Sequence, residues 1–416
     1  MSALRDYAWV TAAYWSFTLT DGALRMLVLL HFHALGYSPV QLAFLFLFYE
    51  FFGIVTNLVG GWVGARLGLK ITLTGGLLLQ VGALAMLSQV QPHWSIASSV
   101  LYVMAAQALS GIAKDLTKMS AKSSIKVLLP RGARGKLFKW VAMLTGSKNA
   151  LKGVGFFLGG LLLSVLDFQR ALLAMAAAIL LVFGGTQLLL PADLGRSKGK
   201  PKFSGIFSKN RQVNVLSAAR FFLFGARDVW FVVGVPVFLY DRLGWTFTAV
   251  GSFLALWIVG YGAVQSLAPL IVGKWTGGSA PEARSAQGLA FGLAGITVAL
   301  AVSLSLNAPP LVLVGVGLPV FGVLFALNSS VHSYLILAYS DGDAVAMNVG
   351  FYYMANAGGR LAGTLLSGLL FERAGVVGCL WGSALFAALA GALSLALPRR
   401  DANIPLSQLT AEGGGD

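Results

Sequence analysis

A ladder of lysines stands out in the stretch GIAKDLTKMSAKSSIK. Lys114, Lys118, Lys122 and Lys126 follow one another at intervals of four residues, and Asp115 lies beside the first of them. On a helix this spacing places the four ammonium groups on one face. Since only 11% of the residues in the chain are charged, such a ladder is either a solvated helix end or a device for holding an anion.

Other ionisable residues lie within apolar stretches of about 20 residues, each long enough to span a bilayer. A charge at the centre of such a span costs roughly 2.5–3.5 kcal/mol on insertion scales, so it must face a partner or a water-filled cavity. The acidic residues of this kind are Asp21, Glu50, Asp115 and Asp228, and the basic ones are Arg25, Lys114, Lys118, Lys148, Lys152, Arg220, Arg227 and Arg360. Eight basic residues against four acidic ones leave four positive charges unbalanced (8 − 4), which predicts a small, multiply charged anion as the ligand.

Spacing and depth predict a role for each basic residue. Lys148 and Lys152 are four residues apart, and Arg220 and Arg227 are seven apart, so each pair shares one helix face. At about 1.5 Å per residue, both lysines, Arg227 and Arg360 lie near mid-membrane. The predicted assignment is Lys114 and Asp115 at the cytoplasmic mouth of the site, and Arg25, Lys118, Lys148, Lys152, Arg220, Arg227 and Arg360 as substrate contacts.

Asp21, Glu50 and Asp228 could each pair with a basic residue or take part in proton coupling. Asp21 and Arg25, at i and i+4, either neutralise each other within one helix or face the cavity separately. Arg227 and Asp228 are adjacent, so their side chains should point apart and Asp228 is expected to pair with another helix. Glu50 is either a proton site or a structural partner for a lysine of the fifth span, and the structural role is favoured. Asp21, Glu50 and Asp228 are the proton-coupling candidates.

The elements that must position these residues are apolar helices. Hydrophobic residues make up 57% of the 416 residues, and glycine, with 51 copies, is abundant as in closely packed transmembrane helices. Twelve spans are predicted near 8–34, 40–64, 71–90, 95–119, 139–166, 171–190, 213–239, 247–273, 286–306, 311–338, 345–371 and 375–397. The third, sixth, ninth and twelfth spans carry no charge, which predicts that they form an outer ring facing lipid.

The chain divides into two similar halves. LGYSPVQLAFLFLFYEFFGIV, from Leu35, resembles LGWTFTAVGSFLALWIVGYGAV, from Leu243, at an offset of 208 residues. The patterns GFFLG and GRLAG, which allow close helix approach, lie at matching places in the fifth and eleventh spans. We therefore predict an all-α polytopic membrane protein of two pseudo-symmetric six-helix bundles. The predicted units are an N-terminal bundle (1–190), a basic linker (191–212), a C-terminal bundle (213–400) and a flexible tail (401–416).

Charge and motifs exclude several other classes of protein. The net charge of +15 is concentrated in the linker and in the loops on its side of the membrane, so the positive-inside rule explains it without nucleic acid and places both termini in the cytoplasm. The single cysteine, Cys379, excludes an intrachain disulfide and a cysteine metal site. No Walker, zinc, dinucleotide or GxSxG motif occurs. We expect neither an enzyme nor a cofactor, and the N-terminal sequence lacks the features of a cleaved signal peptide.

The twelve-span plan with a basic central linker resembles the major facilitator superfamily. GGWVGARLGLK resembles the loop that joins the second and third helices in that superfamily, with Gly61, Arg66, Gly68 and Lys70 matching its pattern. Ala65 stands where an acid is usual, which argues against a charged latch at this loop. Most of the chain also resembles the organoarsenical efflux permeases of arsenic-resistance operons, through AYWSFTLTDGALRMLVLLHFHALGYSP, FYEFFGIVTNLVGGW, ALSGIAKDLTKMSAKSSIK, KWVAMLTGSKNALKGVGFFLGG and SAARFFLFGARDVWFVV.

This resemblance implies export of 1-arseno-3-phosphoglycerate across the bacterial cytoplasmic membrane. The ester forms when glyceraldehyde-3-phosphate dehydrogenase accepts arsenate in place of phosphate, so that enzyme is the expected functional partner. We expect a monomer in the lipid bilayer that works by alternating access with proton coupling. From depth and helix face, Lys148 and Lys152 are expected at one end of the anion and Arg227 with Arg360 at the other, with Arg25 closing the cavity.

Three other functions stay open from the residues alone. An organophosphate–phosphate antiporter needs the same basic cavity. A multidrug exporter is disfavoured, because pumps of cationic drugs use acidic residues. A membrane sensor would keep the fold without transport.

Overall fold

The computed structural model describes residues 2–91, 93–128, 134–191, 210–275, 281–339 and 345–398. Most of the predicted linker and all of the predicted tail lie outside these ranges. The side chains of Lys122, Lys126, Ala65 and Arg66 also lie outside the described part of the chain.

The described residues form helices and no strand. The helices of the N-terminal half are α1 (Ser2–Ala34), α2 (Pro39–Leu45), α3 (Leu47–Leu67), α4 (Leu69–Leu87), α5 (Ile96–Leu128), α6 (Arg134–Val165) and α7 (Phe168–Leu189). Those of the C-terminal half are α8 (Arg211–Phe231), α9 (Gly234–Asp241), α10 (Phe247–Trp275), α11 (Ala283–Ser305), α12 (Pro310–Val312), η2 (Leu313–Gly317), α13 (Leu318–Ala338) and α14 (Val345–Ser394).

These helices match the predicted spans. The second span corresponds to α2 with α3, the seventh to α8 with α9, and the tenth to α12, η2 and α13. The eleventh and twelfth spans both lie in α14, which is interrupted at Gly375, where φ is 61°. Nine helical segments of the described chain are long and apolar enough to cross a membrane. The protein is therefore an all-α, multi-pass membrane protein.

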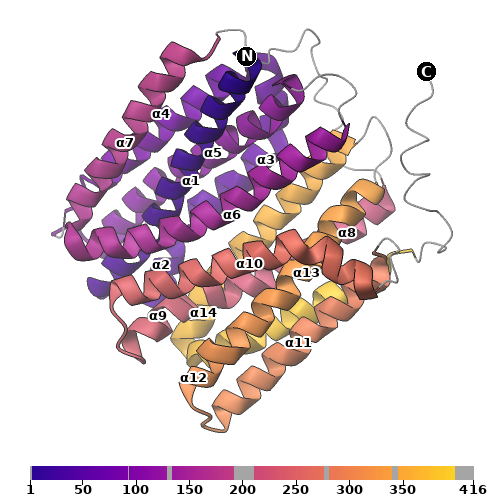
Figure 1. Cartoon of the computed structure of the whole chain (residues 1–416). Coiled ribbons are helices and arrows are strands. Elements are labelled where there is room, and N and C mark those ends of the chain that lie inside the picture. The colour runs from indigo at the N-terminus through magenta and orange to yellow at the C-terminus, as the bar shows by residue number, and fades with distance from the viewer. Residues whose placement is uncertain are drawn as a thin grey trace.

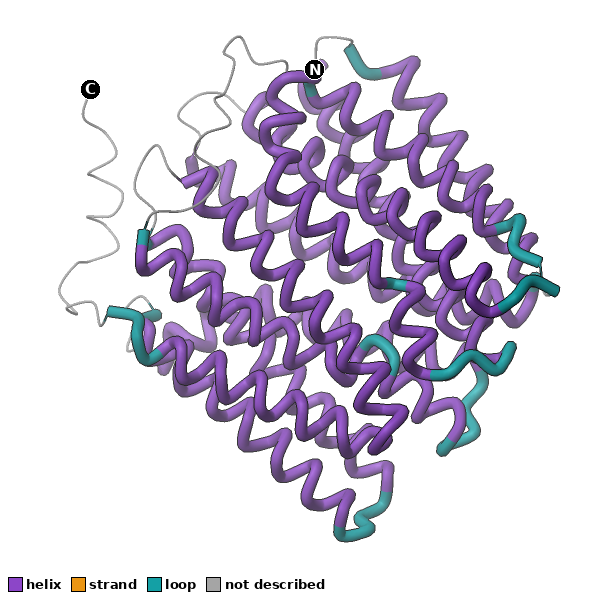
Figure 2. The backbone as a smooth tube through the Cα atoms, turned by 180° about the vertical axis from the view of Figure 1, so that it is seen from behind, coloured by secondary structure: helices purple, strands orange, loops and turns teal. Residues whose placement is uncertain are grey.

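The two halves lie side by side as separate bundles, with α1–α7 in one and α8–α14 in the other (Figure 1). Seen from behind, the described elements are helices joined by loops (Figure 2). We call the end of the molecule where α1 and α8 begin the linker end, and the opposite end, with the turns at Gly36 and Gly244, the far end. Gly36 and Gly244 are 208 residues apart and both have positive φ, 84° and 64°, so the predicted repeat places the same left-handed turn at both positions.

The patterns GFFLG (155–159) and GRLAG (359–363), each with two glycines four residues apart, bring helices into close contact, as predicted. In one half, a Cβ atom at Gly159 would overlap the carbonyl oxygen of Ala23, so α6 lies directly against α1. In the other half, a Cβ atom at Gly359 would overlap the carbonyl oxygen of Phe221, so α14 lies directly against α8. These contacts hold four of the charge-bearing helices in fixed positions.

Contacts between the halves join them at the far end. His33 Nε2 lies 2.8 Å from Asp241 Oδ1, linking α1 to α9. The Val40 N–H donates to Glu372 Oε2 over 3.2 Å, and the hydroxyls of Ser164 and Thr248 lie 3.0 Å apart. We call these three interactions the far-end contacts. His33 and Asp241 are 208 residues apart, so equivalent positions of the two repeats meet each other.

Candidate functional site

A cavity of about 210 Å³ lies between the two halves. Its described walls come from α1, α3, α5 and α6 on one side and from α8, α10, α13 and α14 on the other, with Val232 directly after α8. Among the described residues that line it, none comes from α4, α7, α11 or the part of α14 beyond Gly375, which is consistent with the predicted outer ring. The site therefore lies where charged residues from both repeats can meet.

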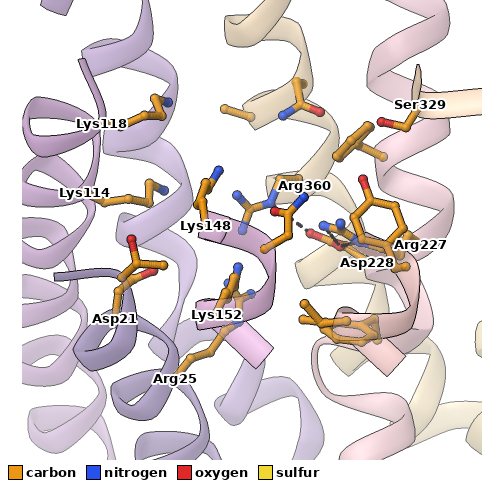
Figure 3. A pocket seen from close by; sticks show the side chains of 18 of the residues that line it. Asp21, Arg25, Lys114, Lys118, Lys148, Lys152, Arg227, Asp228, Ser329 and Arg360 are labelled. Carbon is orange, nitrogen blue, oxygen red and sulfur yellow. Dashed lines mark hydrogen bonds and ion pairs between the residues drawn. The ribbon is translucent and has the colours of Figure 1, made fainter. Parts of the chain in front are cut away.

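The cavity collects the basic residues that the sequence singled out. All seven predicted substrate contacts line it, together with the two predicted mouth residues, Lys114 and Asp115. Lys118 and Ser329 lie toward the linker end, and Arg25 and Lys152 lie deepest (Figure 3). Of the proton-coupling candidates, Asp21 and Asp228 line the cavity. Glu50 lies behind its wall and is fully buried.

An ion-pair network crosses the deep part of the cavity. Arg360 Nη2 donates to Glu50 Oε1 over 2.6 Å, and Arg360 Nε donates to Asp228 Oδ2 over 3.2 Å. Arg25 Nη1 donates to the same Glu50 oxygen over 3.2 Å, and Arg227 Nε donates to Asp228 Oδ1 over 2.6 Å. Because Arg360 belongs to α14 and Glu50 to α3, this network, from Arg25 through to Arg227, ties the two halves together.

Several expected pairings differ in the structure. Asp21 and Arg25 do not neutralise each other, because Asp21 accepts a hydrogen bond from the Tyr49 hydroxyl over 2.7 Å while Arg25 pairs with Glu50. Glu50 has the expected structural role, but its partners are arginines rather than a lysine of the fifth span.

The expectation that Arg227 and Asp228 point apart is wrong. A long arginine side chain can fold back onto its neighbour, and Arg227 does so over 2.6 Å. Asp228 also bonds Arg360 on another helix, and this part of the expectation is confirmed.

Lys152 lies among like charges. It is within electrostatic reach of the cations Arg360, Arg25 and Arg227 and of the acid Asp21. No described carboxylate forms an ion pair with Lys152. A cation held close to three others in a partly desolvated space needs a counter-anion, so this position is suited to a negatively charged ligand.

The lysines of α5 have local partners. Lys118 Nζ lies 2.5 Å from Asp115 Oδ1 and donates to Asn57 Oδ1 over 2.6 Å. Lys114 Nζ lies 4.0 Å from the centre of the Tyr49 ring, a cation–π arrangement. Asp115 also accepts a hydrogen bond from Thr56 over 2.9 Å, so it is a buried anchor for this helix face rather than an open mouth residue.

Uncharged polar residues complete the walls, and sequence reasoning missed them. Asn149 Nδ2 donates to Gln265 Oε1 over 3.0 Å, joining α6 to α10 across the two halves. Gln265 Nε2 lies 3.4 Å from the hydroxyl of Ser329 on α13. Amides and hydroxyls occur throughout membrane helices, so neither their spacing nor their insertion cost could identify Asn149, Gln265 and Ser329 as cavity residues from the sequence.

The charge of the cavity suits the binding of an anion. Its walls contain eight basic residues and three acidic ones, Asp21, Asp115 and Asp228, and Glu50 behind them brings the acids to four. Arginine can hold an oxyanion through two parallel N–H groups, whereas lysine acts as a mobile point charge. Among the described residues, no group of three His, Cys, Asp or Glu side chains is placed to hold a metal ion.

Comparison with known proteins agrees with this architecture. The family model of the Major Facilitator Superfamily matches residues 10–336. A crystal structure of a point mutant of the nucleoside transporter NupG superposes with a TM-score of 0.71 at 14% identity, covering 94% of this chain and 98% of that one. A bacterial homologue of the iron transporter ferroportin, in an inward-facing state, gives a TM-score of 0.69 at 16% identity, covering 95% and 99%.

At these identities the two structures establish the fold and not the substrate. No curated protein matches the sequence. The family match spans most of the chain, and both superposed structures are of transporter folds, so the protein is a membrane transporter rather than an enzyme. The chain belongs to the major facilitator superfamily.

Proposed function

We propose that this transporter exports a small organic anion carrying two or more negative charges. The observation that carries the proposal is the position of Lys152, which lines the cavity within electrostatic reach of three arginines and forms no ion pair with a described carboxylate. A cationic or neutral substrate would leave this repulsion in place, whereas a multiply charged anion would relieve it. The carriers of nucleosides and iron named above share the fold, so the cavity and not the fold supports this choice.

The specific substrate we propose is 1-arseno-3-phosphoglycerate. The long charge-bearing strings that resemble those of organoarsenical efflux permeases support this identity, and several cationic residues of those strings line the cavity, including Arg25, Lys114, Lys152 and Arg227. The ester has an oxyanion at each end, which suits a cavity with basic groups at several depths. Glyceraldehyde-3-phosphate dehydrogenase would supply it.

We propose that the linker end faces the cytoplasm, as the positive-inside rule predicts. The far-end contacts would then close the outer side, and alternating access would require them to break. Proton coupling would use an acid of the cavity. Asp21 is the best placed of the three candidates, because its described partner is the neutral Tyr49 hydroxyl, whereas Glu50 and Asp228 each bond two arginines.

An organophosphate–phosphate antiporter is the second candidate. The same basic walls would hold a phosphate ester and exchange it for inorganic phosphate. Transport measured in everted membrane vesicles, which expose the cytoplasmic face, separates the two functions.

The vesicles would be offered arsenate alone, 3-phosphoglycerate alone, or arsenate with glyceraldehyde 3-phosphate, NAD and the dehydrogenase. We expect arsenic to accumulate only with the complete mixture. Uptake of 3-phosphoglycerate without arsenate would favour the antiporter. The absence of uptake under every condition, with the protein present in the membrane, would contradict both functions and leave a sensor.

Two variants connect transport to the cavity. Lys152→Ala and Arg360→Ala should each reduce the initial rate at least about tenfold, since a charge-assisted contact to the anion contributes about 1.5–3 kcal/mol. Lys274→Ala is the matched control, because Lys274 is exposed in the last turn of α10 and does not line the cavity. Full transport by both cavity variants would show that the anion does not bind there.

A further inference from the structure

Arg220 on α8 lines the cavity apart from the ion-pair network. It lies seven residues before Arg227 on the same helix, so the two Cα atoms are about 10 Å apart along the axis. It is therefore nearer the linker end than Arg227 is. The side chain is 4% exposed.

The charge of Arg220 has no acidic partner among the described residues. Its Nη1 donates to the backbone oxygen and the hydroxyl of Ser329, both over 3.1 Å, while its Nε is buried without a hydrogen-bond partner. The guanidinium carbon lies 3.9 Å from the centre of the Phe224 ring and 4.9 Å from that of Tyr352. The guanidinium group is thus held in a fixed orientation by neutral groups.

This arrangement contrasts with that of the other cavity arginines. Arg25, Arg227 and Arg360 share two described carboxylates, those of Glu50 and Asp228, so each of them has an acid beside it. Arg220 keeps its full charge at a buried position, which is costly inside a membrane protein unless an anion compensates it. Cation–π contacts and two neutral acceptors position the group without supplying that negative charge.

Polar groups from both halves surround this position. Ser329, which holds Arg220, is also approached by Gln265 Nε2 at 3.4 Å, and Gln265 accepts a hydrogen bond from Asn149 over 3.0 Å. Asn149 follows Lys148 on α6, and both residues line the cavity. We call Arg220, Ser329, Gln265 and Asn149 the Arg220 corner.

We propose that the Arg220 corner is a second oxyanion subsite, separate from the deep subsite around Lys152 and Arg360. It would bind the charged group of the anion that lies nearer the linker end, while the other charged group lies deep in the cavity. Arg220 would then make the carrier selective for anions charged at both ends over those charged at one end. This inference rests on the proposed transport of organic anions. It differs from the expectation that Lys148 and Lys152 bind one end of the anion and Arg227 with Arg360 the other, because it divides the two ends along the cavity axis.

Binding measured by calorimetry on the purified full-length protein tests this division. The probes are 2,3-bisphosphoglycerate, which carries a phosphate on each of two carbons as well as a carboxylate, and glycerol 3-phosphate, which has one charged end. We expect the wild-type protein to bind the bisphosphate at least about tenfold more tightly, because a second charge-assisted contact is gained. Arg220→Gln should bring the ratio of the two Kd values, glycerol 3-phosphate to bisphosphate, close to one. It should change the Kd of glycerol 3-phosphate less than about threefold.

Two further variants keep the test sharp. Arg220→Lys retains the charge but not the planar fork, so its ratio should fall between the wild-type and Arg220→Gln values. Arg211→Gln removes the same charge from the exposed first residue of α8 and should leave the ratio unchanged. If Arg220→Gln does not fold, the comparison of Arg220→Lys with Arg211→Gln decides.

The possible outcomes distinguish this inference from the function on which it rests. If Arg220→Gln keeps the wild-type ratio of Kd values, or loses affinity equally for both probes, the second subsite is contradicted, whereas the proposed transport of organic anions is not. If the wild-type protein binds neither probe nor inorganic phosphate, the proposed function itself is contradicted, and the subsite with it.

Discussion

Arg360 shows how single residues connect the halves, because one guanidinium group bonds an acid from each. Glu50 accepts from it within the N-terminal half, and Asp228 accepts from it within the C-terminal half. The Glu50 oxygen Oε2 and the Arg25 nitrogen Nη2 are both buried without hydrogen-bond partners. The network therefore has an unused donor, Arg25 Nη2, that can bond an incoming anion, and an unused acceptor, Glu50 Oε2, that can accept from a water molecule.

Neutralising Glu50 should destabilise the protein much more than neutralising Asp21. Glu50→Gln leaves Arg25 and Arg360 without their shared anion, which should cost about 3–5 kcal/mol. Asp21→Asn keeps an oxygen to accept from Tyr49 and breaks no described ion pair, so its cost should be about 1 kcal/mol or less. The apparent unfolding temperatures of the two purified variants measure the difference.

Added anion should act differently on these variants. Bisphosphoglycerate should raise the unfolding temperature of Glu50→Gln more than that of the wild-type protein, because two arginines become available to it. Equal unfolding temperatures for Glu50→Gln and Asp21→Asn would show that the ion pairs of Glu50 contribute little.

The sequence identified which residues enter the cavity but not how they pair. Insertion cost applies to every charge in an apolar span, so Arg25, Lys152 and Arg360 had to face a cavity or a partner. The partners depend on which helices are adjacent. The i, i+4 spacing of Asp21 and Arg25 carries no information about Tyr49 and Glu50 on α3, which take those two roles.

At the scale of elements, the apolar runs predicted each span and the positions of the turns. Internal irregularities could not be predicted in the same way. The separation of α2 from α3 at Phe46 falls in a run of leucine and phenylalanine without glycine or proline. The π-helical segment η2 also lies in an apolar run, but it contains Gly315 and Gly317 and is followed by Pro319, residues that weaken or kink a helix without fixing the type of irregularity. At Phe46 the local sequence is compatible with a continuous helix, so packing against neighbouring helices decides the outcome there.

The contact between α8 and α14 should be intolerant of any added atom at Gly359. Gly359→Ala would place its Cβ against the Phe221 carbonyl group, which is backbone and cannot move aside cheaply. We expect a loss of about 1–3 kcal/mol in stability, measured as a lower unfolding temperature of the purified protein.

Gly288→Ala on α11 provides the control for this prediction. No heavy atom lies within 4 Å of the position where its Cβ would be, so this variant should unfold at the wild-type temperature or slightly above it. Similar losses in both variants would indicate that the close approach of α8 and α14 is not what Gly359 serves.

At the scale of the whole molecule, the far-end contacts hold the two bundles together on one side of the cavity. His33 and Asp241 form a bond between repeats, whereas Asp167 and Arg170 form an exposed ion pair within one half. Only the first kind of bond must break for the halves to separate at this end.

Removing the His33 contact should therefore favour opening at the far end. In a Cys379→Ala background, a cysteine placed at the buried cavity residue Phe231 would report access by a membrane-impermeant thiol reagent. His33→Ala should raise the labelling rate in right-side-out vesicles about threefold to fivefold, the change expected for loss of one partly exposed pair.

Asp167→Ala removes a far-end charge without touching the contact between halves, so it should not change the labelling rate. Faster labelling in Asp167→Ala than in His33→Ala would mean that surface charge, and not the bond between repeats, controls access from this side.

The excess of fixed cations in the cavity also determines which force can drive the carrier. Eight basic residues against four acids compensate a multiply charged anion without an accompanying metal ion or several protons. An anion carried in this way moves its own charge through the electric field of the membrane. Each negative charge that leaves a cell whose interior is negative releases about 2.3 kcal/mol per 100 mV. The resting voltage of the cell would then favour the export of such an anion, and a proton gradient would add to that driving force.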